Sequence, residues 1–145
     1  MGDAAGSAPV RWKKTEAGRS PGMGGAFMMA TTPIWEGIKV AVCSAGFGSR
    51  GDEEPAEGQD LATSRIGLRM SGSTEAALIC SRPLTIQSGE EDTVIPLEGA
   101  QRAFPAARAY CEKLGIARRI ELNVHPQGHV FKNEAVFRFF DRHLR

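Results

Sequence analysis

Hydrophobic and polar positions follow two different periods in the second half of the chain. In the segment PLTIQS, Leu84 and Ile86 alternate with polar residues, which is the period of a strand. After residue 99, apolar residues recur at steps of three and four, which is the pattern of an amphipathic helix. These apolar residues are Ala100, Ala103, Phe104, Ala107, Tyr110, Cys111 and Leu114. The sequence therefore predicts a strand, a short acidic connection and a helix. Pro105 lies inside the helical stripe, where a proline costs about 3 kcal/mol, so we expect it to interrupt the helix.

The same two periods predict four more elements. Residues 24–32, GGAFMMATT, are expected to form a short helix that ends before Pro33. Residues 38–46 and 119–125 are expected to be strands. The last expected helix covers residues 133–144. The apolar residues that share one face of this helix are Val136, Phe137, Phe140 and Leu144.

Two stretches lack such a period. Residues 47–75 are acidic and rich in glycine in their first part, and we expect a loop or lid. Residues 1–21 are rich in Gly, Ala, Ser and charge, and we expect a loose amino-terminal arm. Strands separated by helices favour parallel pairing with right-handed crossovers. We therefore expect residues 22–145 to form an α/β unit with about three parallel strands and flanking helices.

Composition excludes several classes of function. The 145 residues suffice for one modest domain, and 18 basic residues nearly balance 17 acidic ones. This balance gives no electrostatic reason to expect nucleic acid or a membrane surface as a partner. No apolar run approaches the roughly 20 residues that span a bilayer. The three cysteines are scattered without metal-ligand spacing, so we expect reduced thiols, a cytoplasmic location and no cofactor or metal.

An aspartate and a histidine are the candidate chemical groups. Asp92 follows the strand that contains Leu84 and Ile86, and His129 follows the strand at 119–125. The carboxyl ends of adjacent parallel strands meet at one edge of a sheet, where ligands and catalytic groups gather. A carboxylate there can fix the tautomer of an imidazole and leave its other nitrogen free as a general base. Glu90 and Glu91 are expected to be solvated turn residues.

The segments RPLTIQSGEEDTVIPLEGAQRAF, LNVHPQGHVF and FFDRHL resemble the carboxyl-terminal half of the α/β-hydrolase family, most of all its dienelactone-hydrolase and acetyl-xylan-esterase relatives. The likeness covers roughly residues 22–145. In that family the chain order is nucleophile, acid, histidine. The resemblance implies a partial α/β-hydrolase fold in which Asp92 is the triad acid and His129 the triad histidine.

The nucleophile has two candidate positions. The segment GRSPG satisfies the pattern G-x-S-x-G and nominates Ser20. However, the residue after the nucleophile must donate its backbone N–H to the oxyanion, and Pro21 has none. The alternative alignment uses GMGG, which resembles the S-M-G-G of such turns and places Gly22 at the nucleophile position.

Two functions are therefore expected as alternatives. The first is a serine hydrolase that cleaves small carboxylic esters, in a truncated form with low or no activity. The second is a non-catalytic α/β-hydrolase remnant or interaction module. The resemblance also implies a strand beside residues 38–43, contributed by the segment before the nucleophile, and this sequence shows no clear counterpart; we therefore expect self-association through an exposed strand edge.

Overall fold

The computed structural model describes residues 17–21, 23–48 and 72–144. Its elements, in chain order, are β1 (Ala17–Pro21), α1 (Met23–Thr31), β2 (Val40–Ser44), α3 (Gly72–Ile79), β3 (Leu84–Gly89), α4 (Leu97–Lys113), the 3₁₀ turn η1 (Ala117–Arg119), β4 (Ile120–His125) and α5 (Asn133–His143). Within these ranges, no helix combines the length and the apolar character needed to cross a membrane.

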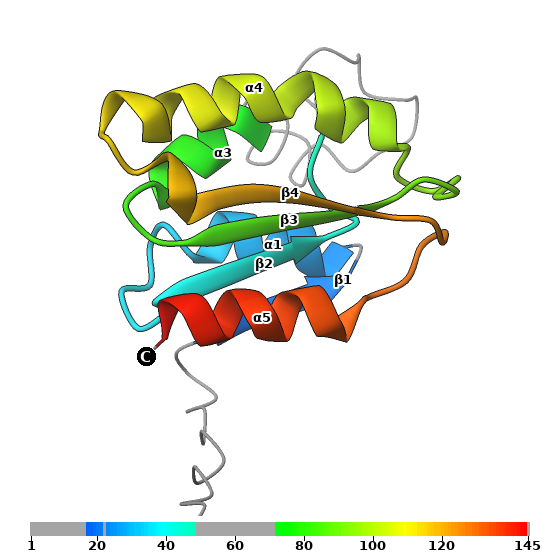
Figure 1. The fold of residues 1–145 in the computed structure, drawn as a ribbon, viewed down its shortest axis with the longest axis horizontal. Coiled ribbons are helices and arrows are strands. Elements are labelled where there is room, and N and C mark those ends of the chain that lie inside the picture. The colour runs from blue at the N-terminus through cyan, green and yellow to red at the C-terminus, as the bar shows by residue number, and fades with distance from the viewer. Residues whose placement is uncertain (1–16, 22, 49–71, 145) are drawn as a thin grey trace, which may run out of the picture.

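The strands form one parallel sheet in the order β1-β2-β3-β4. The three predicted strands, β2, β3 and β4, are confirmed, and so is their parallel pairing. The register aligns Val42 with Thr85 and Gly89 with His125. As a result, β3 and β4 reach the same edge of the sheet together, and the segments that follow them leave side by side (Figure 1).

Helices cover both faces of the sheet (Figure 1). Side chains from α1, α3 and α4 pack on one face, and Met29, Ile79 and Ala107 belong to this core. On the other face, α5 packs against β2. Since successive residues of a strand point to opposite faces, β2 must be apolar on both sides. Because helices pack on both faces of the sheet, every residue of β2 and β3 is buried.

β1 corrects the expected amino-terminal arm. Residues 17–21 form a strand that pairs along β2, with Ser20 in register with Cys43. Residues 1–16 lie outside the described residues. β1 has a polar, charged sequence without the hydrophobic period that predicts a strand. It is a strand because its backbone pairs with the open edge of β2. β2 is paired on both sides, which removes the reason given for self-association through its edge.

Two further expectations were wrong. Residues 72–75, the end of the loop expected at 47–75, begin helix α3 (Gly72–Ile79), whereas residues 49–71 lie outside the described residues. α4 also runs without a break through Pro105, whose side chain is exposed. The proline removes one backbone donor from the helix, but buried residues on both sides of it, Ala103 and Ala107, hold the helix against the sheet.

Phe139 anchors α5, although the sequence pattern had assigned Phe137 to the buried face. Phe139 is fully buried against Val40 and Val42, and Phe137 is 44% exposed. We expect Phe139→Ala to lower the free energy of unfolding by about 3–5 kcal/mol, since it empties a large core site. Phe137→Ala, in the same helix, should cost less than about 1 kcal/mol. Urea unfolding of both variants measures this, and equal costs would contradict the packing of α5.

Candidate active site

Asp92 is held in a tight turn between β3 and α4. Its Oδ1 accepts backbone N–H groups from Val94 and Ile95, both at 2.9 Å. These bonds bend the chain from the end of the strand toward the start of the helix at Leu97. The carboxylate is nearly inaccessible, with 1% of the side chain exposed. Its position is therefore set by the backbone of its own turn.

His129 approaches Asp92 from the segment after β4. Its Nδ1 lies 2.9 Å from Asp92 Oδ2 and 3.2 Å from Oδ1. An ionised carboxylate can only accept, so in this contact Nδ1 carries the hydrogen. The imidazole side chain is 32% exposed. The predicted contact between Asp92 and His129 is confirmed, and the partly exposed ring leaves Nε2 as the nitrogen available for other chemistry.

Backbone contacts hold the two segments together. The N–H of Glu90 donates to the carbonyl of His125 at 2.9 Å, and the N–H of Glu91 donates to the carbonyl of Gln127 at 3.3 Å. Gly89 permits this approach, because a Cβ at that position would lie 2.2 Å from the carbonyl oxygen of Gln127. Both side chains, Glu90 and Glu91, are exposed, in line with their expected place in a solvated turn.

Gln87 fixes the chain just after His129. This buried residue of β3 accepts the backbone N–H of Lys132 on its Oε1 at 2.7 Å. Its Nε2 donates to the carbonyl of the same Lys132 at 2.9 Å. Ser44 Oγ donates to the Oε1 as well, at 3.2 Å. The segment that carries His129 is thus tied to the sheet at both ends, by Gly89 on one side and by Gln87 on the other. The sequence pattern did not single out Gln87, since an amide in a strand carries no distinctive spacing.

The electrostatic environment keeps Asp92 ionised. Burial alone would raise the pKa of this carboxyl group. The N–H groups of Ile95 and Val94 and the imidazole of His129 outweigh burial, so the pKa lies below its ordinary value. Asp92 therefore remains a carboxylate at neutral pH and can stabilise a positively charged imidazole.

A second histidine lies close by but in a different environment. His125, the last residue of β4, is buried, and its Nδ1 has no hydrogen-bond partner among the described residues. Burial, followed by the positive charge of Lys132, lowers the pKa of His125. The His125 ring is therefore neutral at neutral pH, and the residue pairs in register with Gly89 at the end of β3.

The structure does not bring Ser20 to a turn. Ser20 lies within β1, one residue before the end of the strand, and nothing further is described of its side chain. β1 ends at Pro21 and α1 begins at Met23. Gly22, the alternative position, is the one residue between them and lies outside the described residues. The junction between β1 and α1 therefore falls at Gly22, the position that the alternative alignment uses, and not at Ser20.

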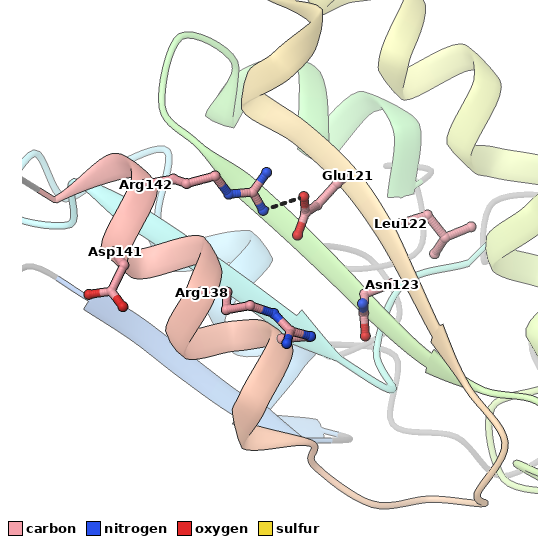
Figure 2. Close-up of a pocket in the computed structure, with 7 residues that line it drawn as sticks. Glu121, Leu122, Asn123, Arg138, Asp141 and Arg142 are labelled. Atoms are coloured by element: carbon pink, nitrogen blue, oxygen red, sulfur yellow. Dashed lines mark hydrogen bonds and ion pairs between the residues drawn. The ribbon is translucent and has the colours of Figure 1, made fainter.

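A groove between β4 and α5 lies apart from the Asp92–His129 pair. Figure 2 shows that Glu121, Asn123, Arg138 and Arg142 line it. Arg142 contacts Glu121 at 2.8 Å, and Arg138 contacts Glu134 at 2.7 Å, so both guanidinium groups are already paired. Neither Asp92 nor His129 lines the groove. We therefore place the candidate site at the pair, where the chemically suited groups meet.

Comparison with solved structures shows a shared fold. The chain is similar to a family 15 glucuronoyl esterase from Caldicellulosiruptor kristjansonii, with a TM-score of 0.64 at 19% identity, over 83% of this chain and 41% of that one. Methylesterase BT1017 matches with a TM-score of 0.69 at 17% identity, over 87% of this chain and 29% of that one. TT1662 from Thermus thermophilus matches with a TM-score of 0.65 at 16% identity, over 86% of this chain and 52% of that one.

These similarities establish the fold as part of an α/β-hydrolase fold. The chain spans between about three tenths and about half the length of these three structures. Comparison with protein-family models and with curated protein sequences finds no match.

Gly89→Ala should disturb the pair without touching either member. The added methyl group meets carbonyl oxygens of Gln127 and Gly128, which are backbone atoms and cannot swing away. We expect a loss of about 1–3 kcal/mol in the free energy of unfolding. The His129 Nδ1 proton signal in ¹H NMR spectra should be lost as well. Gly48→Ala is the matched control, because a Cβ there has ordinary contacts at 3.8 Å. Equal behaviour of the two variants would contradict the close approach.

The lowered pKa of Asp92 predicts a pH-dependent stability. The unfolded chain binds a proton at this carboxyl group more readily than the folded chain does. The stabilisation is therefore complete above the unfolded pKa, about 4, and is lost as pH falls through the lower folded pKa. We expect the difference in unfolding free energy between wild type and Asp92→Asn to shrink over that range. Urea unfolding from about pH 7 to 3 measures it. A difference that stays constant would mean that the Asp92 carboxylate is not stabilised in the fold.

Proposed function

We propose that Asp92 and His129 are the acid and the base of a serine-type ester hydrolase site. The observation that carries this proposal is the 2.9 Å contact between His129 Nδ1 and a buried, ionised carboxylate. The pair sits at the carboxyl ends of adjacent parallel strands, where open α/β sheets place their reactive groups. Three of the solved structures that share the fold are described as esterases, which supports an ester as the substrate class.

The proposed chemistry follows from the orientation of the ring. Asp92 holds Nδ1 and stabilises the imidazolium, and Nε2 accepts the proton of an attacking hydroxyl group. The hydroxyl oxygen adds to the ester carbonyl carbon, and Nε2 returns its proton to the departing alcohol. Nε2 then deprotonates a water molecule that hydrolyses the acyl group from the protein. No step needs a metal ion or an organic cofactor.

We further propose that this chain, as it stands, hydrolyses esters weakly or not at all. At the junction of β1 and α1 the sequence supplies Gly22, which has no hydroxyl group. Ser20 is followed by Pro21, which cannot donate an N–H to the oxyanion. The alternative function, a non-catalytic interaction module, is favoured by this same junction. It would retain the pair for reasons of structure.

Replacing Gly22 by serine separates these two functions. Gly22→Ser puts a hydroxyl group at the junction and leaves Met23, the first residue of α1, as the following residue, and Met23 has the backbone N–H that Pro21 lacks. We expect the hydrolysis of 4-nitrophenyl acetate to rise about ten-fold or more over wild type, with labelling by a fluorophosphonate probe. The double variant Gly22→Ser/His129→Ala should return to the wild-type rate.

Ser20→Ala is the matched control. We expect it to leave both the wild-type rate and the Gly22→Ser rate unchanged. If wild type hydrolyses the ester and Ser20→Ala abolishes this, Ser20 is the nucleophile and the assignment to Gly22 is wrong. If Gly22→Ser stays unlabelled while its unfolding is unchanged, the site does not act as a serine hydrolase and the non-catalytic function holds.

A further inference from the structure

Two cysteines far apart in the sequence meet between α3 and α4. The sulfur atoms of Cys80 and Cys111 lie 3.2 Å apart, and both thiols are free. A disulfide bond is about 2.05 Å long, so closing it needs a movement of about 1.2 Å. No sequence pattern predicts this pairing, because 31 positions separate the two residues.

The surroundings of the two sulfurs differ. Cys111 is buried in the core between α4 and the sheet, with 3% of its surface exposed. Cys80 follows the last residue of α3 and is half-buried. The next residue, Ser81, has a φ of 89°, which turns the chain away from the helix toward β3. Cys80 therefore lies at a helix end, where a small shift disturbs little packing, and it is the member of the pair that solvent reaches.

We propose that Cys80 and Cys111 form an intramolecular disulfide that links α3 to α4 when a small-molecule disulfide, such as oxidised glutathione, is present. The proposal does not depend on the ester-hydrolase function. The loop that this bond closes contains β3, the Asp92 turn and most of α4. The link would therefore fasten the helical layer that supports Asp92.

The reaction balances as two thiol–disulfide exchanges. The thiolate of Cys80 attacks one sulfur of the small disulfide, forms a mixed disulfide and releases one small thiolate. The thiolate of Cys111 then attacks the Cys80 sulfur, forms the protein disulfide and releases the second small thiolate. The two protein thiols are oxidised, the small disulfide is reduced to two thiols, and the two protons of the protein thiols go to solvent or to the released thiolates.

Burial makes the second exchange the slow one. Burial, together with the hydrogen bond to Cys80, raises the pKa of the Cys111 thiol to about 12. Little Cys111 is therefore ionised at neutral pH. We expect the mixed disulfide at Cys80 to accumulate before the protein disulfide forms, and its conversion to become faster as pH rises, by up to about ten-fold per pH unit.

Cys43 offers an internal control. It lies on β2, has no exposed surface and belongs to the same core. The contact on which the proposal depends joins the sulfurs of Cys80 and Cys111, which follow α3 and lie on α4 respectively. The folded protein should therefore discriminate sharply between the three cysteines.

Peptide mapping of the oxidised protein tests the proposal. The reduced chain is incubated with oxidised glutathione, quenched with iodoacetamide and digested with trypsin without reduction. Trypsin does not cleave between Arg82 and Pro83, so it releases Cys43 in peptide 40–50, Cys80 in peptide 70–102 and Cys111 in peptide 109–113. We expect peptides 70–102 and 109–113 to be joined, and the intact mass to be about 2 Da below that of the reduced chain before alkylation.

Single variants show whether the fold selects the pair. Cys43→Ala should form the same link, and Cys111→Ala should stop at the mixed disulfide on Cys80. In concentrated urea, the preference for the 80–111 link over links to Cys43 should largely disappear, because the unfolded chain no longer holds the two sulfurs together. The proposal is overturned if folded protein links Cys43 in comparable amounts, if all three thiols stay reduced, or if urea leaves the selectivity unchanged.

Discussion

The close approach of two backbone turns at Gly89 is the constraint on which the candidate site depends. Parallel pairing of β3 with β4 brings Gly89 level with His125. The absence of a side chain at Gly89 then lets the carbonyl group of Gln127 come within a distance that any Cβ would forbid. Backbone bonds from Glu90 and Glu91 close the contact. The Asp92–His129 contact follows from this geometry, because both residues lie within four positions of it. A change in the backbone here reaches both members of the pair at once.

The sequence predicted the parts of the structure in which one pattern decides the outcome. Alternating apolar residues predicted β3, and apolar residues at steps of three and four predicted α4. The order of strands and helices implied parallel neighbours. Those two inferences were enough to predict that Asp92 and His129 lie together, and the structure confirms their contact. They did not reveal Gln87, which holds the chain after His129 through its amide group. A buried amide in a strand has no spacing that distinguishes it from a solvated one.

Other features depend on partners that are distant in the sequence. β1 is polar, and it is a strand because β2 offers it an open edge. α3 has eight residues, too few for its pattern to stand out next to an acidic, glycine-rich stretch. Phe137 and Phe139 both suit an amphipathic helix, and only the position of α5 over β2 decides that Phe139 is buried. The expected interruption at Pro105 is absent for the same reason: the packing of Ala103 and Ala107 on either side of the proline outweighs the loss of one hydrogen bond.

Asp92 has a structural role that does not require catalysis. One of its oxygens, Oδ1, accepts the N–H groups of Val94 and Ile95, and Oδ2 holds His129. The bonds to Oδ1 shape the turn that leads into α4, and a substitution of Asp92 would leave these two backbone donors without their acceptor. A chain that lacked a nucleophile would therefore still be selected to keep Asp92 in place. The imidazole would stay near it, because Gln87 and Gly89 fix the segment that bears His129. An intact acid–histidine pair is thus compatible with both proposed functions, and the residue at the junction between β1 and α1 is what distinguishes them.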